Sequence, residues 1–343
     1  MQTARTLAQP EAPPGAGPAE RGVGRDGFRD AVPESVKVAV AVCATWLLLI
    51  IATTAYQTDF ISHQTVLSVT FTMAVVGVLA VAEGLVVISG GMIDLSLPTS
   101  LILAATVTTD LLDHGLNIVP VIFVAIAVGG AWGALNAAII VFGKINPIIV
   151  TLGTNLAGVA LLNIHISGYS TIPPNAGLAT WGDGLSLGLP NVFWVMVLAI
   201  LLAGYLLPRT RVGTRVLAVG GSTQAAKVRG ISLRKTRFGV FITSGMVVGL
   251  AAVLFAASDH SFSVADGTTY LLPPIAAVIV AGISLAGGSG NLWVLFASVG
   301  LLSTIPTSMA FFGLSDLWQQ VPPGLILVAA VSIDGFRRKR ATR

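Results

Sequence analysis

Residues 208–237 read PRTRVGTRVLAVGGSTQAAKVRGISLRKTR, and long apolar segments lie on either side of them. The stretch holds eight basic residues and no acidic residue. Basic loops of polytopic membrane proteins are retained on the cytoplasmic side. The stretch therefore predicts a cytoplasmic loop between two sets of membrane-spanning helices, and residues 222–231 within it are expected to form a short helix.

The composition also indicates a membrane protein. Of the 343 residues, 54% are hydrophobic and 10% are charged, whereas soluble domains carry about 25% charged residues. The bilayer core is crossed by about 20 apolar residues of helix, and no run shows the two-residue alternation of a barrel strand. The predicted fold is an all-α polytopic membrane helix bundle of about ten transmembrane helices, at residues 36–56, 65–88, 93–112, 118–142, 147–166, 190–208, 238–258, 271–286, 291–312 and 321–336.

The two ends of the chain differ from this apolar domain. Residues 1–35 are rich in proline, glycine and charged side chains, which is typical of a disordered tail. The transmembrane domain is expected at 36–336, with the cytoplasmic loop at 208–237 and a basic tail at 337–343. All nineteen basic residues fall on one side if the N-terminus is cytoplasmic and the chain crosses ten times. Both termini are therefore predicted to be cytoplasmic.

The sequence gives little support for an enzyme or for a metal site. The single cysteine, Cys43, lies in an apolar run, and the four histidines come from different segments without ligand spacing. No nucleophile–base set and no phosphate-binding loop is present. We expect no catalytic residue, no metal, no cofactor bound by this chain and no nucleic-acid partner.

A pair of glycines, Gly90-Gly91, separates the second and third apolar runs. Glycine breaks a helix cheaply because it reaches backbone angles that other residues avoid. Asp94 follows, either as a helix cap at the membrane surface or in a broken helix that lines a transport path. Buried polar side chains in spans can line a path or bond to a neighbouring helix. The candidate path residues are Glu83, Gly90, Gly91, Asp94, Ser96, Asn136 and Asn155.

A second pair, Gly287-Gly288, separates the eighth and ninth runs. Its surroundings are similar to those of Gly90-Gly91, but a six-residue similarity is too short to predict an internal repeat.

Four stretches resemble the permease subunits of bacterial ABC importers of the ribose/simple-sugar type, a family that includes autoinducer-2 permeases. They occur in the family's order, and the similarity runs from about residue 36 to residue 336. The stretches are GLVVISGGMIDLS (84–96), GALNAAIIVFGKINPIIVTL (133–152), TRVGTRVLAVGGSTQAAKVRGI (210–231) and AAVIVAGISLAGGSG (276–290).

By this resemblance, residues 221–231 form the coupling segment that contacts a separate ATP-hydrolysing subunit. The chain departs from the family pattern at Gln224, where glutamate is usual, at Arg229, at Asn146 and at Pro98. The residues that the resemblance assigns to coupling are Gly221, Gln224, Ala225, Ala226, Lys227 and Gly230.

The resemblance implies the permease subunit of an ATP-driven importer for a sugar or a similar small polar solute. Its partners would be an ABC ATP-binding subunit that brings ATP and Mg²⁺, an extracytoplasmic solute-binding protein, a second permease copy or paralogue, and the lipids of a bacterial plasma membrane. The alternative is an ion-coupled secondary transporter, which would need ion-binding groups such as Glu83 and Asp94 within the membrane.

Overall fold

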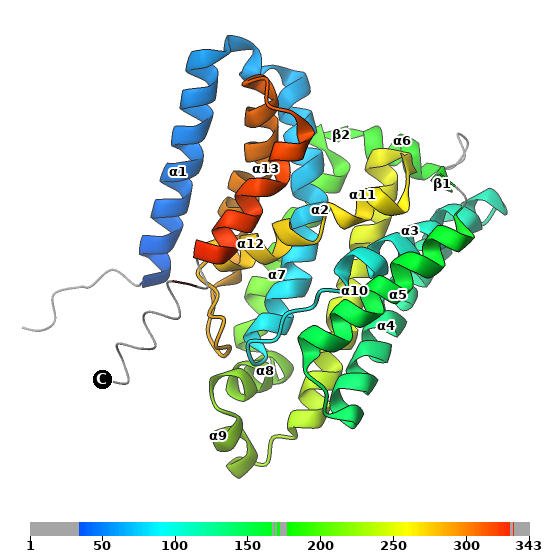
Figure 1. The fold of residues 1–343 in the computed structure, drawn as a ribbon, viewed down its shortest axis with the longest axis vertical. Helices are drawn as coiled ribbons and strands as arrows, with labels where there is room; N and C mark the ends of the chain where they lie inside the picture. The colour runs from blue at the N-terminus through cyan, green and yellow to red at the C-terminus, as the bar shows by residue number, and fades with distance from the viewer. Residues whose placement is uncertain (1–33, 167, 169, 172–176, 330–331, 333–343) are drawn as a thin grey trace, which may run out of the picture. The chain divides into compact units, whose positions relative to one another are not determined.

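The computed structural model describes residues 34–166, 168, 170–171, 177–329 and 332. The predicted tails at 1–35 and 337–343 lie outside these residues, except that residues 34 and 35 begin the first helix. The helices are α1 (Glu34–Tyr56), α2 (His63–Ile88), α3 (Leu97–Asp113), α4 (Ile118–Gly143), α5 (Pro147–His165), α6 (Gly177–Asp183), α7 (Asn191–Arg209), α8 (Arg211–Gly221), α9 (Thr223–Val228), α10 (Leu233–Asp259), α11 (Val264–Thr268), α12 (Leu272–Val280) and α13 (Leu295–Phe311) (Figure 1).

Helices make up nearly all of the regular structure in the described chain. Seven of them are long and apolar enough to cross a membrane, namely residues 35–56, α2, α4, α5, α7, α10 and 292–311. Helices suit this role because they satisfy every backbone hydrogen bond within one segment. The predicted all-α polytopic membrane bundle is confirmed.

Three of the ten expected spans are shorter than the apolar runs suggested. The run at 93–112 forms α3, which begins at Leu97 and has 17 residues. The run at 271–286 forms the nine-residue α12, beyond which Gly282 and Gly287 have positive φ. The tenth run is helical at 321–329, and residues 333–336 lie outside the described chain. Breaks at glycines, rather than a lack of apolar residues, shorten α3 and α12.

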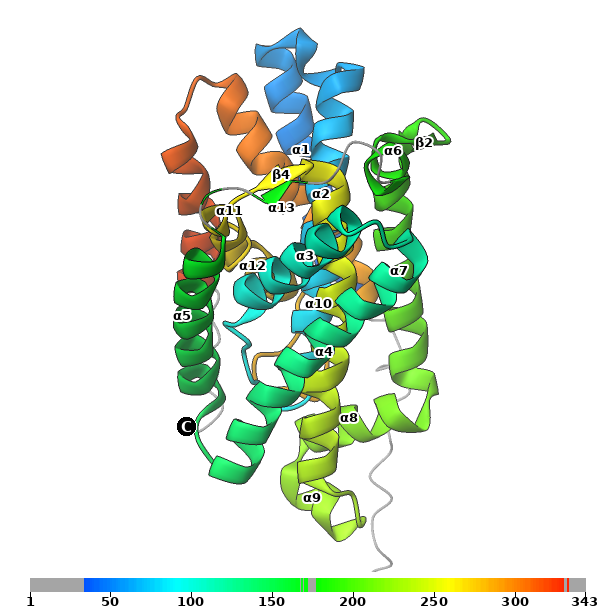
Figure 2. The same ribbon diagram turned by 90° about the vertical axis from the view of Figure 1, so that its right-hand side faces the viewer.

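The centre of the bundle is formed by α2 and α10, both of which are largely buried. α4 packs along α10 (Figure 2). A Cβ added to Gly245 would meet the carbonyl of Gly129, and one added to Gly249 would meet that of Ala125. The two α10 glycines have the GxxxG spacing that lets helix backbones approach closely in lipid.

α1 is the most exposed of the seven spans and lies beside α13 (Figure 1). Trp46 Nε1 donates a 2.8 Å hydrogen bond to Thr304 Oγ1, a residue 258 positions further along the chain. The indole of Trp46 also covers Gly300, where a Cβ would collide with the ring. A single tryptophan thus provides both a polar and a close-packed contact between α1 and α13.

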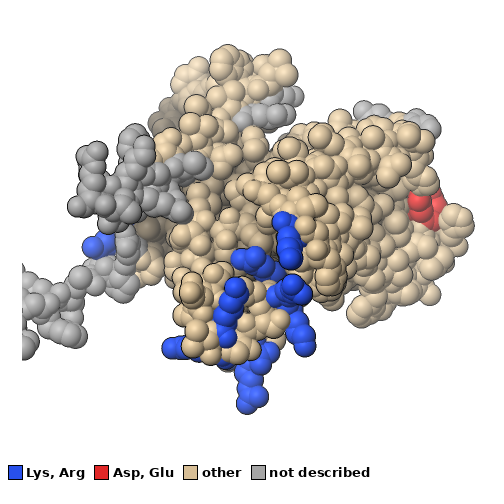
Figure 3. Space-filling model, turned by 60° about the horizontal axis from the view of Figure 1, so that its bottom comes forward, with Lys and Arg blue, Asp and Glu red and all other residues tan. Residues whose placement is uncertain are grey.

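The two ends of the bundle carry different structures. α8 and α9 lie at one end, where Lys and Arg side chains gather (Figure 3). α6 and the short strands lie at the other (Figure 1). β1 (Ser170–Thr171) pairs antiparallel with β4 (Ser261–Phe262), and β2 (Leu185–Ser186) pairs with β3 (Leu189–Pro190).

Candidate functional site

The break between α2 and α3 occupies residues 89–96 and is shaped by two glycines. Gly90 has a φ of +149° and Gly91 a φ of +67°, values that side chains rarely adopt. At Gly91 a Cβ would also meet the carbonyl oxygen of Leu285. The backbone therefore requires glycine here, and the predicted helix break is present.

Two buried carboxylates hold the chain just after this break. The backbone N–H of Asp94 donates to both carboxylate oxygens of Glu83, with N···O distances of 3.3 Å. Asp94 Oδ1 accepts from the backbone N–H of Ser96 at 2.9 Å and from its hydroxyl at 2.6 Å. Glu83 is fully buried and Asp94 is 5% exposed. Asp94 is thus part of a buried turn ahead of α3, not a cap at the membrane surface.

Asn136 of α4 joins this turn to α5. Its Nδ2 donates to Ser96 Oγ at 2.7 Å, and its Oδ1 accepts from Thr154 Oγ1 at 2.7 Å. The side chain is fully buried, so water does not compete for either bond. One amide thereby connects the residue that precedes α3 with α4 and α5.

α5 reaches the same region through two further side chains. Asn155 Oδ1 accepts from the backbone N–H of Thr99 at 3.2 Å and from its hydroxyl at 2.8 Å. The backbone N–H of Leu95 donates to Thr151 Oγ1 at 3.1 Å. Thr151, Thr154 and Asn155 are three and four residues apart, so they share one face of α5.

The structure therefore brings the predicted path residues together. Hydrogen bonds run from Glu83 through Asp94, Ser96 and Asn136 to Thr154, with Asn155 bonded alongside. Gly90 and Gly91 form the break beside this network. Asn136 and Asn155 make interhelical hydrogen bonds. This is the second of the two roles that the sequence suggested for polar side chains within spans, the first being to line a path.

Sequence reasoning missed the three threonines of the network, Thr99, Thr151 and Thr154. Threonines are common in apolar helices because their hydroxyls can bond to their own helix, as Thr151 also does with Pro147 O at 2.9 Å. The sequence feature that could have identified two of them is spacing: Thr151 lies three and four residues before Thr154 and Asn155, so the three share one helix face.

The break between α12 and α13 lies against the first one. Gly287 and Gly288 have φ values of +87° and +76°. The N–H of Gly288 donates to the carbonyl of Ile88, the last residue of α2, at 2.8 Å. A Cβ on Gly287 would lie 2.7 Å from Gly90 Cα. The two breaks therefore touch through backbone atoms.

α8 ends at the same point. A Cβ on Gly220 would meet the carbonyl of Ile88, and a Cβ on Gly288 would meet the backbone of Gly221. At this place α8 touches Ile88, which directly precedes the first break, and Gly288 of the second break, with no side chain in between. We call it the glycine junction, and it consists of Gly90, Gly91, Gly220, Gly221, Gly287 and Gly288.

α9 follows α8 directly and forms the short helix predicted within residues 222–231. The hydroxyl of Ser222 accepts from the backbone N–H of Ala225 at 3.2 Å, as an N-cap does. Gly230 follows the helix with a φ of +76°. Both ends of α9 are therefore determined by local residues.

The exposed side of α9 differs from the predicted one at a single residue. Ala226 is 1% exposed and packs inside this chain, so a partner cannot reach it. Gln224, Ala225 and Lys227 are exposed. Val228, which sequence reasoning did not single out, is 86% exposed. A large apolar side chain is thus exposed at the end of α9.

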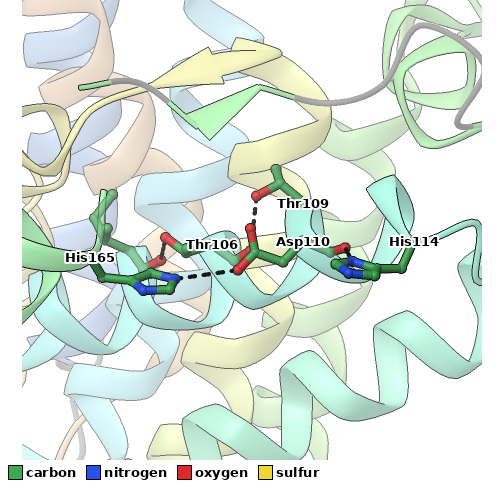
Figure 4. Close-up of polar contacts among 6 residues, drawn as sticks. Thr106, Thr109, Asp110, His114 and His165 are labelled. Atoms are coloured by element: carbon green, nitrogen blue, oxygen red, sulfur yellow. Dashed lines mark hydrogen bonds and ion pairs between the residues drawn. The ribbon is translucent and has the colours of Figure 1, made fainter. Parts of the chain in front are cut away.

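At the opposite end of the bundle, α3 and α5 are joined a second time. His165 Nε2 lies 3.5 Å from Asp110 Oδ2, and His114 Nδ1 lies 2.7 Å from the backbone carbonyl of Asp110 (Figure 4). In the described part of the chain, no group of three or more His, Cys, Asp or Glu residues is arranged to hold a metal. Exposed ion pairs contribute about 0–1 kcal/mol, so this pair only supplements the Asn155 contact.

A hollow of about 410 Å³ lies at this same end, between the start of α2, the end of α10 and the segment before α12. Sequence reasoning did not locate it because its walls come from segments far apart in the chain. Its polar and aromatic lining residues are Gln64, Ser68, Phe71, Thr72, Ser258, Asp259 and Tyr270. Ligand sites commonly combine such hydrogen-bonding and aromatic groups.

Comparison with known proteins identifies the family to which the chain belongs. Residues 65–331 match the family described as "Branched-chain amino acid transport system / permease component". The ribose import permease protein RbsC of Escherichia coli (strain K12) is 30% identical over 296 residues, which cover 85% of this chain and 92% of that protein. RbsC of Bacillus subtilis (strain 168) is 29% identical over 296 residues, covering 86% and 91%. No solved structure matches the chain.

An arabinose permease is also similar. The L-arabinose transport system permease protein AraH of Escherichia coli (strain K12) is 30% identical over 256 residues, which cover 74% of this chain and 77% of that protein. The resemblance identified from four sequence stretches is confirmed, and the matched residues include both breaks, the glycine junction and α9. The chain is a multi-pass membrane protein that belongs to the family of branched-chain amino acid transport system permease components.

Proposed function

We propose that the chain is the permease subunit of an ATP-driven importer that carries a sugar or a similar small polar solute into the cell. Relatives named as ribose and L-arabinose permeases support this class of solute. A second permease copy or paralogue completes the passage, an extracytoplasmic binding protein delivers the solute, and separate ABC ATP-binding subunits hold ATP and Mg²⁺.

The observation that carries the proposal is the glycine junction. ATP-binding subunits dock on the exposed side of α9, at Gln224, Ala225, Lys227 and Val228. α9 follows α8, and α8 ends on the backbone of Ile88, directly before the first break, and on that of the second break. Packed interiors deform little, so a displacement of α9 reaches the breaks through contacts that contain no flexible side chain.

Movement of the first break changes the walls of the passage. Ser96 is bonded to Asn136, and Asn136 to Thr154, so α3, α4 and α5 respond together. The passage needs only a difference in access between two states. The residues that we assign to its frame are Glu83, Gly90, Gly91, Asp94, Ser96, Asn136 and Asn155.

The hollow of about 410 Å³ at the other end serves as the first contact for the solute. Its hydroxyl, amide and carboxylate groups can exchange hydrogen bonds with a polyhydroxylated solute, and Phe71 and Tyr270 can pack on its apolar face. This assignment places the hollow outside and the α8–α9 end, with both termini, in the cytoplasm of a bacterial cell.

Two matched variants test the docking surface. Val228 on α9 is 86% exposed and Leu187 at the opposite end is 89% exposed, so Val228→Asp and Leu187→Asp introduce the same charge at comparable positions. The parent and Leu187→Asp, purified from their native host, are expected to carry Mg-ATP hydrolysis activity. Val228→Asp is expected to lose it, because a buried unpaired carboxylate weakens an interface strongly.

Sugar uptake by proteoliposomes tests the alternative, an ion-coupled secondary transporter. Ribose and L-arabinose are the probes, with and without Mg-ATP. If the purified chain carries no ATPase and still accumulates either sugar along an ion gradient, the importer assignment is wrong. Glu83 and Asp94 then become the candidates for ion coupling.

A further inference from the structure

A second hollow, of about 700 Å³, lies at the end of the bundle that carries α8 and α9. It is bounded by the last turn of α4, the residues that lead into α5, the end of α9 and the first turns of α10. This hollow is distinct from the polar network, although one of its lining residues reaches the break between α2 and α3. A Cβ on Gly90 would lie 3.6 Å from Nη2 of Arg237, a residue that lines the hollow.

All charged side chains that line this hollow are positive. Lys144, Lys227, Arg234 and Arg237 line it, and no acidic residue does. Within the described ranges, the side-chain ion pairs are those of His165 and His260, so none of the four cations is paired with a carboxylate. Cations that share one hollow repel each other, and the repulsion is relieved when an anion binds between them.

Arg237 adds an independent observation. Its Nε is enclosed by the protein, and in the described chain it has no hydrogen-bond partner. A buried donor without a partner costs free energy. Guanidinium groups fit phosphate oxygens well because several N–H groups lie in one plane. Because Arg237 lines the hollow, its guanidinium favours an oxyanion there.

Apart from Ser232, the remaining walls of the hollow are apolar, and exposed apolar side chains of the spans lie beyond them. Ile140, Ile145 and Leu233 line it. Beyond them, Phe142 of α4 is 72% exposed and Ile149 of α5 is 65% exposed. The hollow thus lies where membrane-crossing helices end, with cations inside and apolar surface beside it. A free anion would use the cations alone, whereas a phospholipid would use both features.

We propose that this hollow binds the phosphate headgroup of an anionic phospholipid. Lys144, Arg234 and Arg237 hold the phosphate, and the acyl chains lie along the exposed apolar sides of α4 and α5. Basic pockets between membrane helices on the cytoplasmic side suit anionic headgroups. Lys227 reaches the same lipid from α9, so the bound lipid fastens the coupling segment to α4 and α10.

Lipid retention by the purified full-length chain tests this proposal. Native mass spectrometry compares phosphatidylglycerol with phosphatidylcholine of the same acyl chains, in the parent and in Lys144→Gln/Arg234→Gln. The parent is expected to retain phosphatidylglycerol preferentially. At about 1 kcal/mol for each basic residue, removal of two charges weakens its binding by about 30-fold.

A neighbouring lysine provides the matched control. Lys235 is exposed and does not line the hollow, so Lys235→Gln is expected to bind phosphatidylglycerol like the parent. The single variant Arg234→Gln, with an expected fivefold loss, replaces the double variant if the latter has a lowered melting temperature in phosphatidylcholine.

Four outcomes would overturn the proposal. The first is equal retention of the two lipids by the parent. The second is an equal loss in Lys235→Gln, which would indicate unspecific surface charge. The third is displacement of the lipid by millimolar inorganic phosphate. The fourth is binding of an acidic segment of a partner protein in the hollow in place of lipid.

Discussion

Asn136 illustrates how much of the polar region depends on one side chain. Its amide makes two 2.7 Å hydrogen bonds, one to each neighbouring helix segment. Asn163, on α5, bonds instead to the carbonyl of Val159 in its own helix at 2.9 Å and is exposed. The two asparagines have the same chemistry, so the difference in their surroundings decides what each contributes.

We predict that Asn136→Ala destabilises the protein by about 1–3 kcal/mol, because it removes the interhelical hydrogen bonds of a fully buried amide to Ser96 Oγ and Thr154 Oγ1. The measurement is the melting temperature in lipid nanodiscs. Asn163→Ala is the control and is expected to leave the melting temperature unchanged. Equal effects of the two substitutions would show that the network does not hold the helices together.

At the scale of elements, the glycine junction is the most constrained contact. Four of its six residues have positive φ, and four of its members would place a Cβ against the backbone of another segment. Side chains elsewhere in the bundle can change rotamer to relieve a new contact, but backbone atoms cannot. Substitutions here therefore affect α8 and both breaks at once.

Gly288→Ala is expected to cost about 1–3 kcal/mol, because alanine is strained at a φ of +76° and its Cβ meets Gly221. It is also expected to abolish most ATP-driven uptake of ribose or L-arabinose, whichever the parent carries. Gly239→Ala in α10 is the control, since nothing lies within 4 Å of its added Cβ. It is expected to be neutral or to stabilise by up to about 1 kcal/mol. Retained uptake by Gly288→Ala would argue against transmission through the junction.

The limits of sequence reasoning are also clearest at the element scale. The runs at 118–142 and 147–166 agree with α4 and α5 to within one residue at each end, because apolar length determines a span. The same criterion overestimates α3 and α12, since Ile93, Leu95 and Ile283 continue the apolar character through the breaks.

The candidate site could be predicted as a set of residues but not as a set of contacts. Polar side chains within apolar runs identify Glu83, Asp94, Asn136 and Asn155. Their partners lie up to 56 positions away in the chain, and tertiary packing selects them. The exposed residues of α9 were predictable except at Ala226 and Val228, because a short helix of small residues does not reveal which face packs inward.

For the whole molecule, the charge distribution predicts one orientation in the membrane. The end with α8 and α9 carries the basic loop, and the opposite end carries Asp110, Asp183 and Asp259. Since basic residues are retained on the cytoplasmic side, α9 is expected inside and the β2–β3 turn outside.

Cysteine labelling of right-side-out membrane vesicles tests this orientation. With Cys43→Ser as background, Leu187→Cys is expected to react with a membrane-impermeant maleimide, whereas Lys235→Cys is expected to react only after permeabilisation. Denatured samples of both variants serve as the control for intrinsic reactivity. Labelling of the Lys235→Cys variant in sealed vesicles would show that the orientation is the opposite of the predicted one and that α9 is not cytoplasmic.

The contact between Trp46 and Thr304 has a consequence for biosynthesis. The ribosome adds roughly 5–20 residues per second, so the 258 residues between the two positions take about 13–50 seconds to make. During that time α1 is already in the bilayer, but α13, which it packs against, does not yet exist. The first span is therefore surrounded by lipids before α13 is made. The indole N–H of Trp46 can bond to Thr304 only after residue 304 has been translated.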